Sequence, residues 1–395
     1  MHTDRRHSFG MTRWSRAVAS LACACPLMLP AHAQAQDADN DGIPDACEVS
    51  AGAIDDDCDG YLDSCEQRYG NFDLDGDIDA KDLVVVLNQW GHVGAVIGDI
   101  DGDSFVNGRD LGLLLVRWGA VEYSGPPGVA WASTIEFAPD PLIVTDANLR
   151  AAITSTGLPW RIRDCGTQIE MLLVPKGTFM MGCSGSTSYG CYLDESPVHE
   201  VTLTSAFYLG RYEVTQAQWQ ATMGQNPSNY TGFADSPSRP VERVSWTTVQ
   251  AFTNQTGLRL PTEAEREYAC RAGTTTAFHS VPGYPAGTNN DALLGTIAWF
   301  TNNSSGRTHA VGGKAANALG LHDMSGNVYE WVSDWYGEYP SSSQTDPSGP
   351  ATGIYRVMRG GGWHWSSGTC RSSRREYFDP AYSHYDIGFR VARSP

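Results

Sequence analysis

The sequence predicts an α+β fold in which short strands, few helices and long loops enclose an aromatic core. Two segments, Thr215–Met223 and Pro261–Tyr268, have the pattern of helices, and the chain around them shows only short strand-like runs. Tryptophan and tyrosine are abundant, with 12 and 17 residues, and such side chains suit a loop-rich core better than a large sheet. Three glycines and a tryptophan, Gly360–Trp363, indicate close backbone packing near the C-terminus, because glycine tolerates positive φ.

The length of 395 residues allows two or three domains, and the 41% hydrophobic content supports at least one sizeable core. Residues 1–36 are predicted to be a secretory signal peptide, because four arginines precede the mostly apolar run Ala17–Pro30 and small residues allow cleavage near Ala33. Cys23 and Cys25 leave a lipoprotein as the weaker alternative. No later run reaches the ~18 apolar residues of a membrane-spanning helix. We therefore expect an exported protein that is secreted, periplasmic or at the cell surface, with no transmembrane helix in the mature chain.

Most of the net charge of −18 comes from one segment. Residues 37–110 contain 20 acidic residues against three basic ones, Arg68, Lys81 and Arg109, which leaves −17. This charge disfavours nucleic acid as a partner.

The acidic residues of this segment follow a 12-residue template of calcium-binding loops, in which positions 1, 3, 5, 9 and 12 carry oxygen ligands and position 6 is usually glycine. Four windows fit it. Their predicted ligands are Asp37, Asp39, Asp41, Asp45 and Glu48; Asp55, Asp57, Asp59, Asp63 and Glu66; Asn71, Asp73, Asp75, Asp77, Asp79 and Asp82; and Asp99, Asp101, Asp103, Asn107 and Asp110. The repetition predicts Ca²⁺ as a cofactor, with residues 37–69 forming acidic repeats and residues 70–120 a tandem EF-hand-like module.

The last two windows continue into amphipathic helices, predicted at Asp82–Gly91 and Asp110–Gly119. This loop–helix pair resembles a type I dockerin, which implies a small Ca²⁺-folded module that could bind a cohesin-like receptor. Ala80–Lys81 and Gly108–Arg109 stand where dockerins usually carry small hydroxyl residues, so a calcium-stabilised spacer is an equal alternative. The first two windows are more similar to thrombospondin type 3 repeats.

Residues 121–165 are predicted to link this module to a larger domain at residues 166–395. Ser124–Gly128 is rich in glycine and proline, and Thr145–Asp146 precede a predicted helix at Ala147–Thr156 that Gly157 ends.

The C-terminal stretch Gly320–Trp331 contains a second candidate cation site. Asp323, Gly326, Val328 and Glu330 could supply carbonyl and carboxylate oxygens to Ca²⁺ from one tight turn. The alternative is an ordinary Gly-Asn turn that leads into a strand.

Several segments, in the same order along the chain, resemble the formylglycine-generating enzyme (sulfatase-modifying factor) family. They are Met171–Gly182, Pro197–Leu203, Tyr212–Trp219, Pro240–Trp246, Leu258–Glu265, Gly320–Trp331, Arg359–Trp363 and Gly388–Val391. The resemblance implies a C-type-lectin-like α+β fold with little regular secondary structure. It also implies an oxidase that converts a cysteine of a Cys-x-Pro-x-Arg motif to formylglycine with O₂ and Cu(I) held by two cysteines.

The copper pair of the family is incomplete in this sequence. Aligned forward from Gly360, the first copper position holds Trp365 and only the second is filled, by Cys370. Aligned backward from Gly388, Cys370 instead matches a family cysteine that forms a structural disulfide, which implies Cys270 as its partner. Two soft thiolates suit Cu(I), and one does not complete such a site.

Other residues offer weaker signals. Cys183 and Cys191 are predicted to form a local disulfide, and Cys165 is left to pair with one of Cys47, Cys58 and Cys65. His309, His322, His364 and His384 could share a pocket, although separate core or solvated histidines are the simpler expectation. Asp194, Glu195, Glu263, Glu265 and Glu267 are interpreted as turn and helix-surface charges.

Together these features favour an exported, non-catalytic binding or scaffold protein whose partner is an extracellular or envelope protein or glycan. The alternative is an active or diverged formylglycine-generating oxidase in which Cys370 is the candidate catalytic residue and copper the cofactor.

Overall fold

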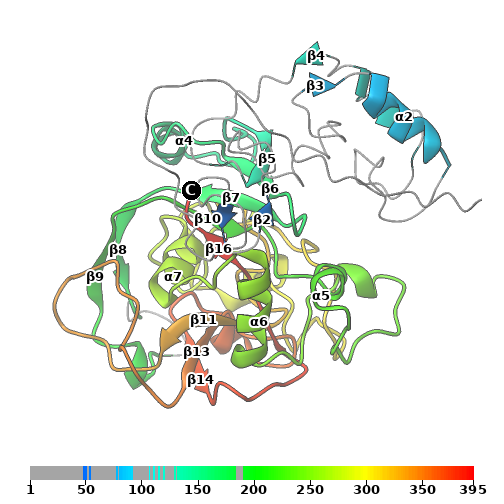
Figure 1. Cartoon of the computed structure of the whole chain (residues 1–395). Coiled ribbons are helices and arrows are strands. Elements are labelled where there is room, and N and C mark those ends of the chain that lie inside the picture. Colours follow the sequence, from blue (N-terminus) through cyan, green and yellow to red (C-terminus); the bar gives the residue numbers. More distant parts are fainter. Residues whose placement is uncertain are drawn as a thin grey trace, which may run out of the picture.

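The computed structural model describes residues 131–183 and 190–395 continuously (Figure 1). Before residue 131 it describes only short segments: 48–50, 53–54, 77–78, 80–91, 106, 110–111, 114–115, 119–120 and 129. Within the described parts, no helix is both long and apolar enough to cross a membrane.

The described N-terminal segments contain one clear helix, α2 (Ala80–Asn88), which covers most of the helix predicted at Asp82–Gly91. The second predicted helix is helical at residues 110–111 and 114–115, but its last residue, Gly119, belongs to a strand. That strand, β4 (Gly119–Ala120), pairs antiparallel with β3 (Asp77–Ile78), and β1 (Glu48–Ser50) pairs with β2 (Ala53–Ile54).

Four predicted ligands of the acidic windows fall on these segments. Glu48 begins β1, Asp77 begins β3, Asp82 lies in α2 and Asp110 is helical. The side chains of Asp82 and Asp110 are fully buried. The other predicted ligands of the four windows, the signal peptide and the linker Ser124–Gly128 lie outside the described residues, so the EF-hand-like module stays a prediction.

Three sheets form the framework of the larger domain. The first has the strand order β16-β10-β7-β6-β5, with strands β5 (Ala132–Glu136), β6 (Arg161–Asp164), β7 (Glu170–Val174), β10 (Phe207–Gly210) and β16 (Ala392–Arg393). The second has the order β14-β13-β11-β15, with strands β11 (Tyr329–Trp335), β13 (Arg356–Arg359), β14 (Arg375–Phe378) and β15 (Ile387–Phe389). The third has the order β12-β9-β8, with strands β8 (Gly177–Met181), β9 (His199–Leu203) and β12 (Gln344–Thr345). The last residues of the chain thus pair with a strand from near the start of the domain.

The α-helices of this domain begin at side-chain caps. They are α4 (Ala147–Thr154), α5 (Gln216–Met223), α6 (Trp246–Thr256) and α7 (Glu263–Arg271). Asp146 caps α4, and Thr215, Ser245 and Thr262 each close a reciprocal capping box at the start of α5, α6 and α7. Helices α4, α5 and α7 lie where the sequence predicts them. Helix α6 was not predicted, because its four threonines and a valine have low helix propensity.

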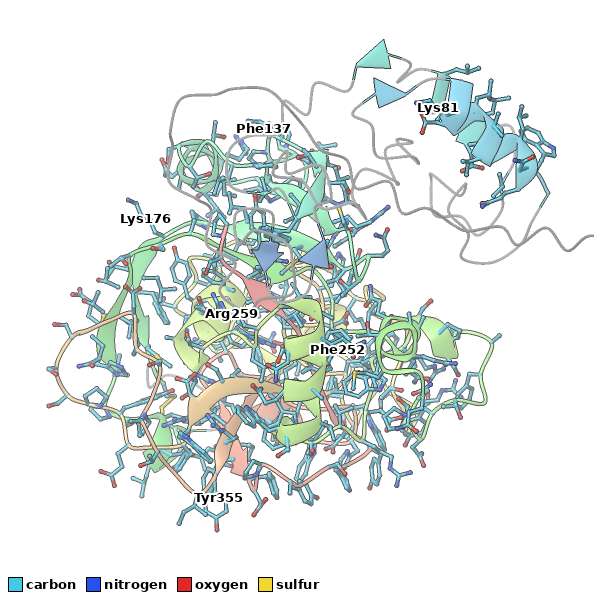
Figure 2. All side chains as sticks on the ribbon, viewed as in Figure 1. Lys81, Phe137, Lys176, Phe252, Arg259 and Tyr355 are labelled. Carbon is cyan, nitrogen blue, oxygen red and sulfur yellow. A yellow bond between two sulfur atoms is a disulfide. The ribbon has the colours of Figure 1, made fainter. Side chains whose placement is uncertain are left out.

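The core lies between the helices and the sheets. Helix α7 packs against β8, β11 and β13, and α5 packs against α6. Phe252 projects from α6 (Figure 2), where its ring stacks on Trp219 with 5.5 Å between centroids and meets the edge of Phe389 at 5.3 Å. Aromatic packing therefore joins two helices to the C-terminal sheet, as the composition predicts.

Arginine side chains are also part of this interior. Arg266, Arg359, Arg371, Arg375 and Arg390 are fully buried. Each pairs with a carboxylate that is itself buried: Glu330 for Arg266 and Arg390, Glu267 and Glu263 for Arg359, Glu195 for Arg371, and Glu263 for Arg375.

The interpretation of the acidic residues as surface charges is therefore wrong for Glu195, Glu263 and Glu267. Arg371, Arg375 and Arg359, which pair with them in that order, stand more than 90 positions away along the chain, so local pattern could not reveal these pairs. Glu267 also has a local partner in Arg271 on the same helix. Glu265, which pairs with Arg259 near the surface, fits the interpretation better.

Candidate functional site

The predicted calcium turn at Asp323–Glu330 folds tightly against two buried arginine side chains. Asp323, Gly326 and Asn327 all have positive φ, so the backbone turns sharply before β11. Arg266 donates to Glu330 through Nε and Nη2 at 2.7 and 3.1 Å, and Arg390 donates through the same atoms at 2.8 Å each. These four bonds occupy all the lone-pair sites of one carboxylate.

Glu330 therefore has no free lone pair for a calcium ion in this arrangement, whereas Asp323 Oδ1 is buried without a hydrogen-bond partner, and a calcium site at this turn stays a prediction. Although burial opposes it, the two guanidinium groups hold the pKa of Glu330 below its ordinary value. Arg266 also donates to the Met324 carbonyl at 2.9 Å, so its guanidinium supplies positive charge to the turn itself.

A buried carboxylate that sequence reasoning missed, Glu213, supports the same turn. It accepts hydrogen bonds from Asn327 Nδ2 at 2.7 Å and from the Val328 N–H at 3.1 Å. Burial, with help from the nearby Asp323, raises the pKa of Glu213 well above its ordinary value, and burial raises the pKa of Asp323 to about 6. Asp323 accepts from the Gly312 N–H at 2.7 Å. This acid pair serves to hold backbone groups in place.

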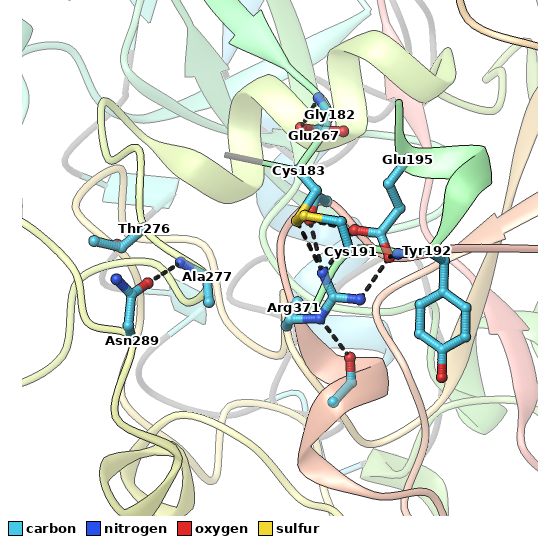
Figure 3. The surroundings of a disulfide bond; sticks show 12 residues. Gly182, Cys183, Cys191, Tyr192, Glu195, Glu267, Thr276, Ala277, Asn289 and Arg371 are labelled. Atoms are coloured by element: carbon cyan, nitrogen blue, oxygen red, sulfur yellow. Dashed lines mark hydrogen bonds and ion pairs between the residues drawn. A yellow bond between two sulfur atoms is a disulfide. The ribbon is translucent and has the colours of Figure 1, made fainter. Parts of the chain in front are cut away.

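The local disulfide is confirmed. Cys183 and Cys191 are bonded, with Cα atoms 5.7 Å apart (Figure 3). Beside the disulfide, Arg371 donates to both oxygens of Glu195, at 2.6 and 2.5 Å, and to Cys183 Sγ at 3.5 Å. Cys165 is also disulfide-bonded, and its partner is not among the described cysteines.

The predicted disulfide between Cys270 and Cys370 is absent, because the structure holds both residues as free, buried thiols. Cys270 Sγ lies 3.5 Å from Ser372 Oγ and 3.6 Å from the Met324 carbonyl. Burial raises the pKa of Cys370 to about 12, and the nearby Cys270 contributes. A thiol that is buried and protonated does not fit the role of an accessible copper ligand or catalytic group.

The residue at the first copper position, Trp365, has a different role. Its side chain is 43% exposed, and its indole N–H donates to Asp386 Oδ2 at 2.6 Å. An indole offers no lone pair for a metal. Among the described residues, the two free cysteines are both buried and do not form the accessible thiolate pair that a Cu(I) site needs.

Two of the four candidate histidines come together around the same carboxylate. His384 Nδ1 hydrogen-bonds to Asp386 Oδ1, and His364 Nδ1 lies 3.4 Å from Asp386 Oδ2. Burial lowers the pKa of His364, with Asp386 opposing and His384 contributing. His309 stacks on Trp299, and His322 stacks on Tyr212, so these two histidines have separate structural roles.

Exposed aromatic rings surround this His–Asp cluster. The aromatic patch consists of Trp365, Phe378, Tyr382 and Tyr385, which are between 36% and 43% exposed, together with His364 and His384. Their rings form a continuous series of contacts from Phe378 through Tyr382, His384, Tyr385 and His364 to Trp365, with centroids 3.8–6.0 Å apart.

Sequence reasoning named His364 and His384 and missed Asp386 and the exposed tyrosines. The available signal was the concentration of aromatic and histidine residues between Trp363 and Asp386.

A separate pocket of about 260 Å³ lies between α7 and the segment after β11. Its charged lining residues include Glu263, Asp334 and Arg375. Arg375 and Glu263 already pair at 2.6 Å, and Asp334 accepts from the Glu263 N–H at 2.8 Å. These charged groups are therefore already bonded to one another within the fold.

The fold and this surface define a loop-rich α+β domain with a buried arginine–carboxylate interior and an exposed aromatic patch. Residues 144–395 match the sulfatase-modifying factor enzyme 1-like domain, which is 252 of the 395 residues, and the chain belongs to this family.

Three comparisons illustrate the range of the family. The chain is 31% identical to the chaperone protein LppX of Paenibacillus barcinonensis, over 57% of this chain and 89% of that protein. It is 34% identical to the formylglycine-generating enzyme of Streptomyces coelicolor, over 45% of this chain and 59% of that enzyme. Among solved structures it resembles Treponema denticola variable protein 1, with a TM-score of 0.52, 31% identity, and coverage of 57% of this chain and 95% of that one.

Proposed function

We propose that the chain is an exported, non-catalytic member of the family that recognises a protein partner through the aromatic patch. The observation that carries this proposal is the exchange at the copper position. Where the resemblance to the oxidases implies a cysteine, Trp365 stands exposed and forms part of the patch.

The cysteine geometry supports the non-catalytic part of the proposal. A substrate thiol must reach the copper ligands, whereas Cys270 and Cys370 are at most 1% exposed. The chain also spans only 59% of the Streptomyces enzyme, so that enzyme's activity does not transfer by similarity alone.

The composition of the patch supports a protein partner. Tryptophan and tyrosine dominate the energetically important positions of protein interfaces, because they bury large rigid areas and keep a polar group for hydrogen bonding. One relative, of which this chain covers 89%, is named a chaperone protein, which is in keeping with protein recognition. A glycan would use the same rings by stacking, and it is the other outcome that the binding test distinguishes.

The oxidase alternative is tested by turnover. The full chain is incubated with Cu(I), O₂ and a peptide that contains Cys-x-Pro-x-Arg, and the peptide mass is followed. We expect no more aldehyde than with Cys370→Ser treated in the same way. Aldehyde that forms only with the wild-type chain would overturn the non-catalytic assignment and establish Cys370 as a working thiol.

The recognition part is tested with a displayed random-peptide library and a glycan array, both probed with the full chain. We expect selected peptides whose affinity falls at least about tenfold in Trp365→Ser and Tyr382→Ser, because interface hot spots contribute about 2 kcal/mol or more. The matched control is Tyr284→Ser, since Tyr284 is 52% exposed and lies outside the patch. Equal loss in the control, or binding of glycans alone, would contradict a protein-binding patch.

For the N-terminal segment we propose Ca²⁺ binding by the acidic windows and export by the signal peptide. Calorimetry should show Ca²⁺ uptake that decreases in Asp82→Asn and Asp110→Asn, the acids at position 12 of the last two windows. A circular dichroism spectrum of residues 37–119 that EDTA does not change would count against it. A cohesin-like receptor can be tested by adding a purified cohesin domain in Ca²⁺. For export, the N-terminus of the mature protein should lie near Ala33.

A further inference from the structure

The His–Asp cluster in the aromatic patch has the composition and spacing of a metal site. His364, His384 and Asp386 each offer one ligand atom, and these three atoms lie within 4.8 Å of one another. The distance between His364 Nδ1 and Asp386 Oδ2 is 3.4 Å. Two ligands at tetrahedral positions around Zn²⁺, with bonds of 2.0–2.1 Å, stand roughly 3.3 Å apart.

His364 Nδ1 provides the second, independent observation. This nitrogen is buried and has no hydrogen-bond partner, although it faces the carboxylate. Leaving a buried polar atom unpaired is unfavourable, and each such atom in a native structure needs an explanation. A metal ion between His364 and Asp386 would satisfy the nitrogen.

The carboxylate already accepts one hydrogen bond on each oxygen, and neither bond comes from His364. Asp386 Oδ1 takes the hydrogen bond with His384, and Oδ2 takes the bond from the Trp365 indole. A bound ion would replace the His384–Asp386 hydrogen bond by coordination of both imidazoles. The Trp365 N–H would remain on the ligating carboxylate, as second-layer donors do in established metal sites.

The backbone around the cluster is held in place before any ion binds. The Asp386 carbonyl accepts from the Tyr329 N–H at 2.7 Å, and the His384 carbonyl accepts from the Arg243 N–H at 3.0 Å. The Asp386 side chain is 3% exposed, whereas those of His364 and His384 are 26% and 31% exposed. The imidazoles can therefore adjust toward an ion while the carboxylate stays fixed.

We propose that His364, His384 and Asp386 bind a divalent transition-metal ion, with Zn²⁺ as the fitting example, and leave at least one coordination position open. Two imidazoles and one carboxylate suit zinc or a similar ion. They do not suit Ca²⁺, which takes six to eight oxygen ligands, or Cu(I), which prefers thiolates. Three protein ligands are the number found in sites that keep a position for water or another ligand. The open position would face the exposed rings of the patch.

The test uses the full chain in excess Ca²⁺, so that oxygen-ligand sites in the acidic windows are filled. Zn²⁺ binding is measured by calorimetry, and Co²⁺ is added as a spectroscopic probe whose visible ligand-field bands report nitrogen coordination. We expect one Zn²⁺ per chain and Co²⁺ bands that Zn²⁺ displaces. Absence of Zn²⁺ uptake in the wild-type chain under these conditions overturns the proposal.

Variants assign the ion to this cluster. Trp365→Phe, which keeps the ring and removes only the donor to the carboxylate, should weaken binding by about 10–100-fold. His364→Ala, His384→Ala and Asp386→Ala each remove a ligand and should weaken it further. His309→Gln is the control, since it removes a partly buried imidazole whose ring stacks on Trp299, outside the patch.

Equal Zn²⁺ affinity in His364→Ala and in the wild-type chain would refute the site. His364 makes no hydrogen bond through Nδ1, so this variant should fold even if the Asp386 variant does not. The site does not depend on the proposed partner. Peptide binding that persists in EDTA would show that recognition does not need the ion. The metal-binding measurement tests the site independently of that result.

Discussion

The buried carboxylate Glu330 allows a strong test of how the interior is stabilised. The change Glu330→Gln keeps the side-chain shape and removes the negative charge between two guanidinium groups. Arg266, Arg390 and Glu330 have side chains that are at most 2% exposed, so water cannot replace the lost partner. Breaking a buried ion pair by removing one partner typically destabilises a protein by about 3–5 kcal/mol.

Two features of the structure place the effect of Glu330→Gln toward the lower end of that range. Arg390 also donates to the Gly210 and His322 carbonyls, at 2.8 and 2.9 Å, and keeps these bonds. Asp323 lies near enough for its charge to interact with that of Arg390, and a carboxyl with a pKa of about 6 can ionise more fully when Glu330 is neutral. For a domain of this size, about 3–5 kcal/mol corresponds to a loss of roughly 6–20 °C in Tm.

Thermal and urea unfolding of the full chain at neutral pH would measure the Glu330→Gln effect. The control is Glu136→Gln, because Glu136 pairs with Arg161 at 2.8 Å but its side chain is 36% exposed. Exposed pairs contribute at most about 1 kcal/mol. If Glu330→Gln and Glu136→Gln shift Tm by the same small amount, the buried ion pairs of Glu330 do not stabilise the domain more than an exposed pair does.

Three further predictions follow from the buried titratable groups and cysteines. Burial, with the nearby Glu263, raises the pKa of Asp334 to about 7, so between about pH 4 and pH 7 the folded state holds a proton that the unfolded state has lost. Stability due to this group should therefore fall as the pH rises through that window. In Asp334→Asn this slope, measured by urea unfolding at several pH values, should be absent, and an unchanged slope would contradict the assignment. An alkylating reagent followed by peptide mass spectrometry should leave Cys270 and Cys370 unmodified in the native protein and modify both after denaturation without reductant, whereas resistance of both after denaturation would restore the Cys270–Cys370 disulfide. Replacing Cys183 and Cys191 by serine should lower the free energy of unfolding by about 2–3 kcal/mol for a loop this short, which urea titration with and without reductant would check against the wild type.

Local signals in the sequence predicted the elements whose boundaries depend on local hydrogen bonds. The helices that begin after Asp146, Thr215 and Thr262 lie where they are expected, since each cap satisfies N–H groups only three residues away. Helix α6 has the same kind of cap at Ser245, but its threonine-rich sequence has a low helix propensity and so did not indicate a helix. The packing of Phe252 against Trp219 and Phe389 stabilises helix α6, and helix propensity does not include such tertiary contacts.

The candidate site depends on contacts that local pattern does not encode. His364 and His384 stand 20 positions apart, and they meet because the chain between them forms β14 and returns toward β15. The sequence suggested that histidines could gather, but it could not say which of the four would do so. It also could not show that Trp365, which the forward alignment places at a copper position, would donate to the carboxylate that both imidazoles face.

Glu330 is paired with arginines, whereas Asp386 faces histidines. This difference explains why we expect a metal ion at Asp386 and not at Glu330. A guanidinium keeps its charge at all physiological pH values, so an ion could reach Glu330 only by displacing Arg266 or Arg390 from four hydrogen bonds. Asp386 instead faces two imidazoles, each of which offers a lone pair to a metal ion in its neutral form. An ion at Asp386 therefore gains ligands from the groups that would repel it in their protonated form. By this reasoning, we expect a metal ion at Asp386 in the aromatic patch and not at Glu330, whose charge two arginines neutralise.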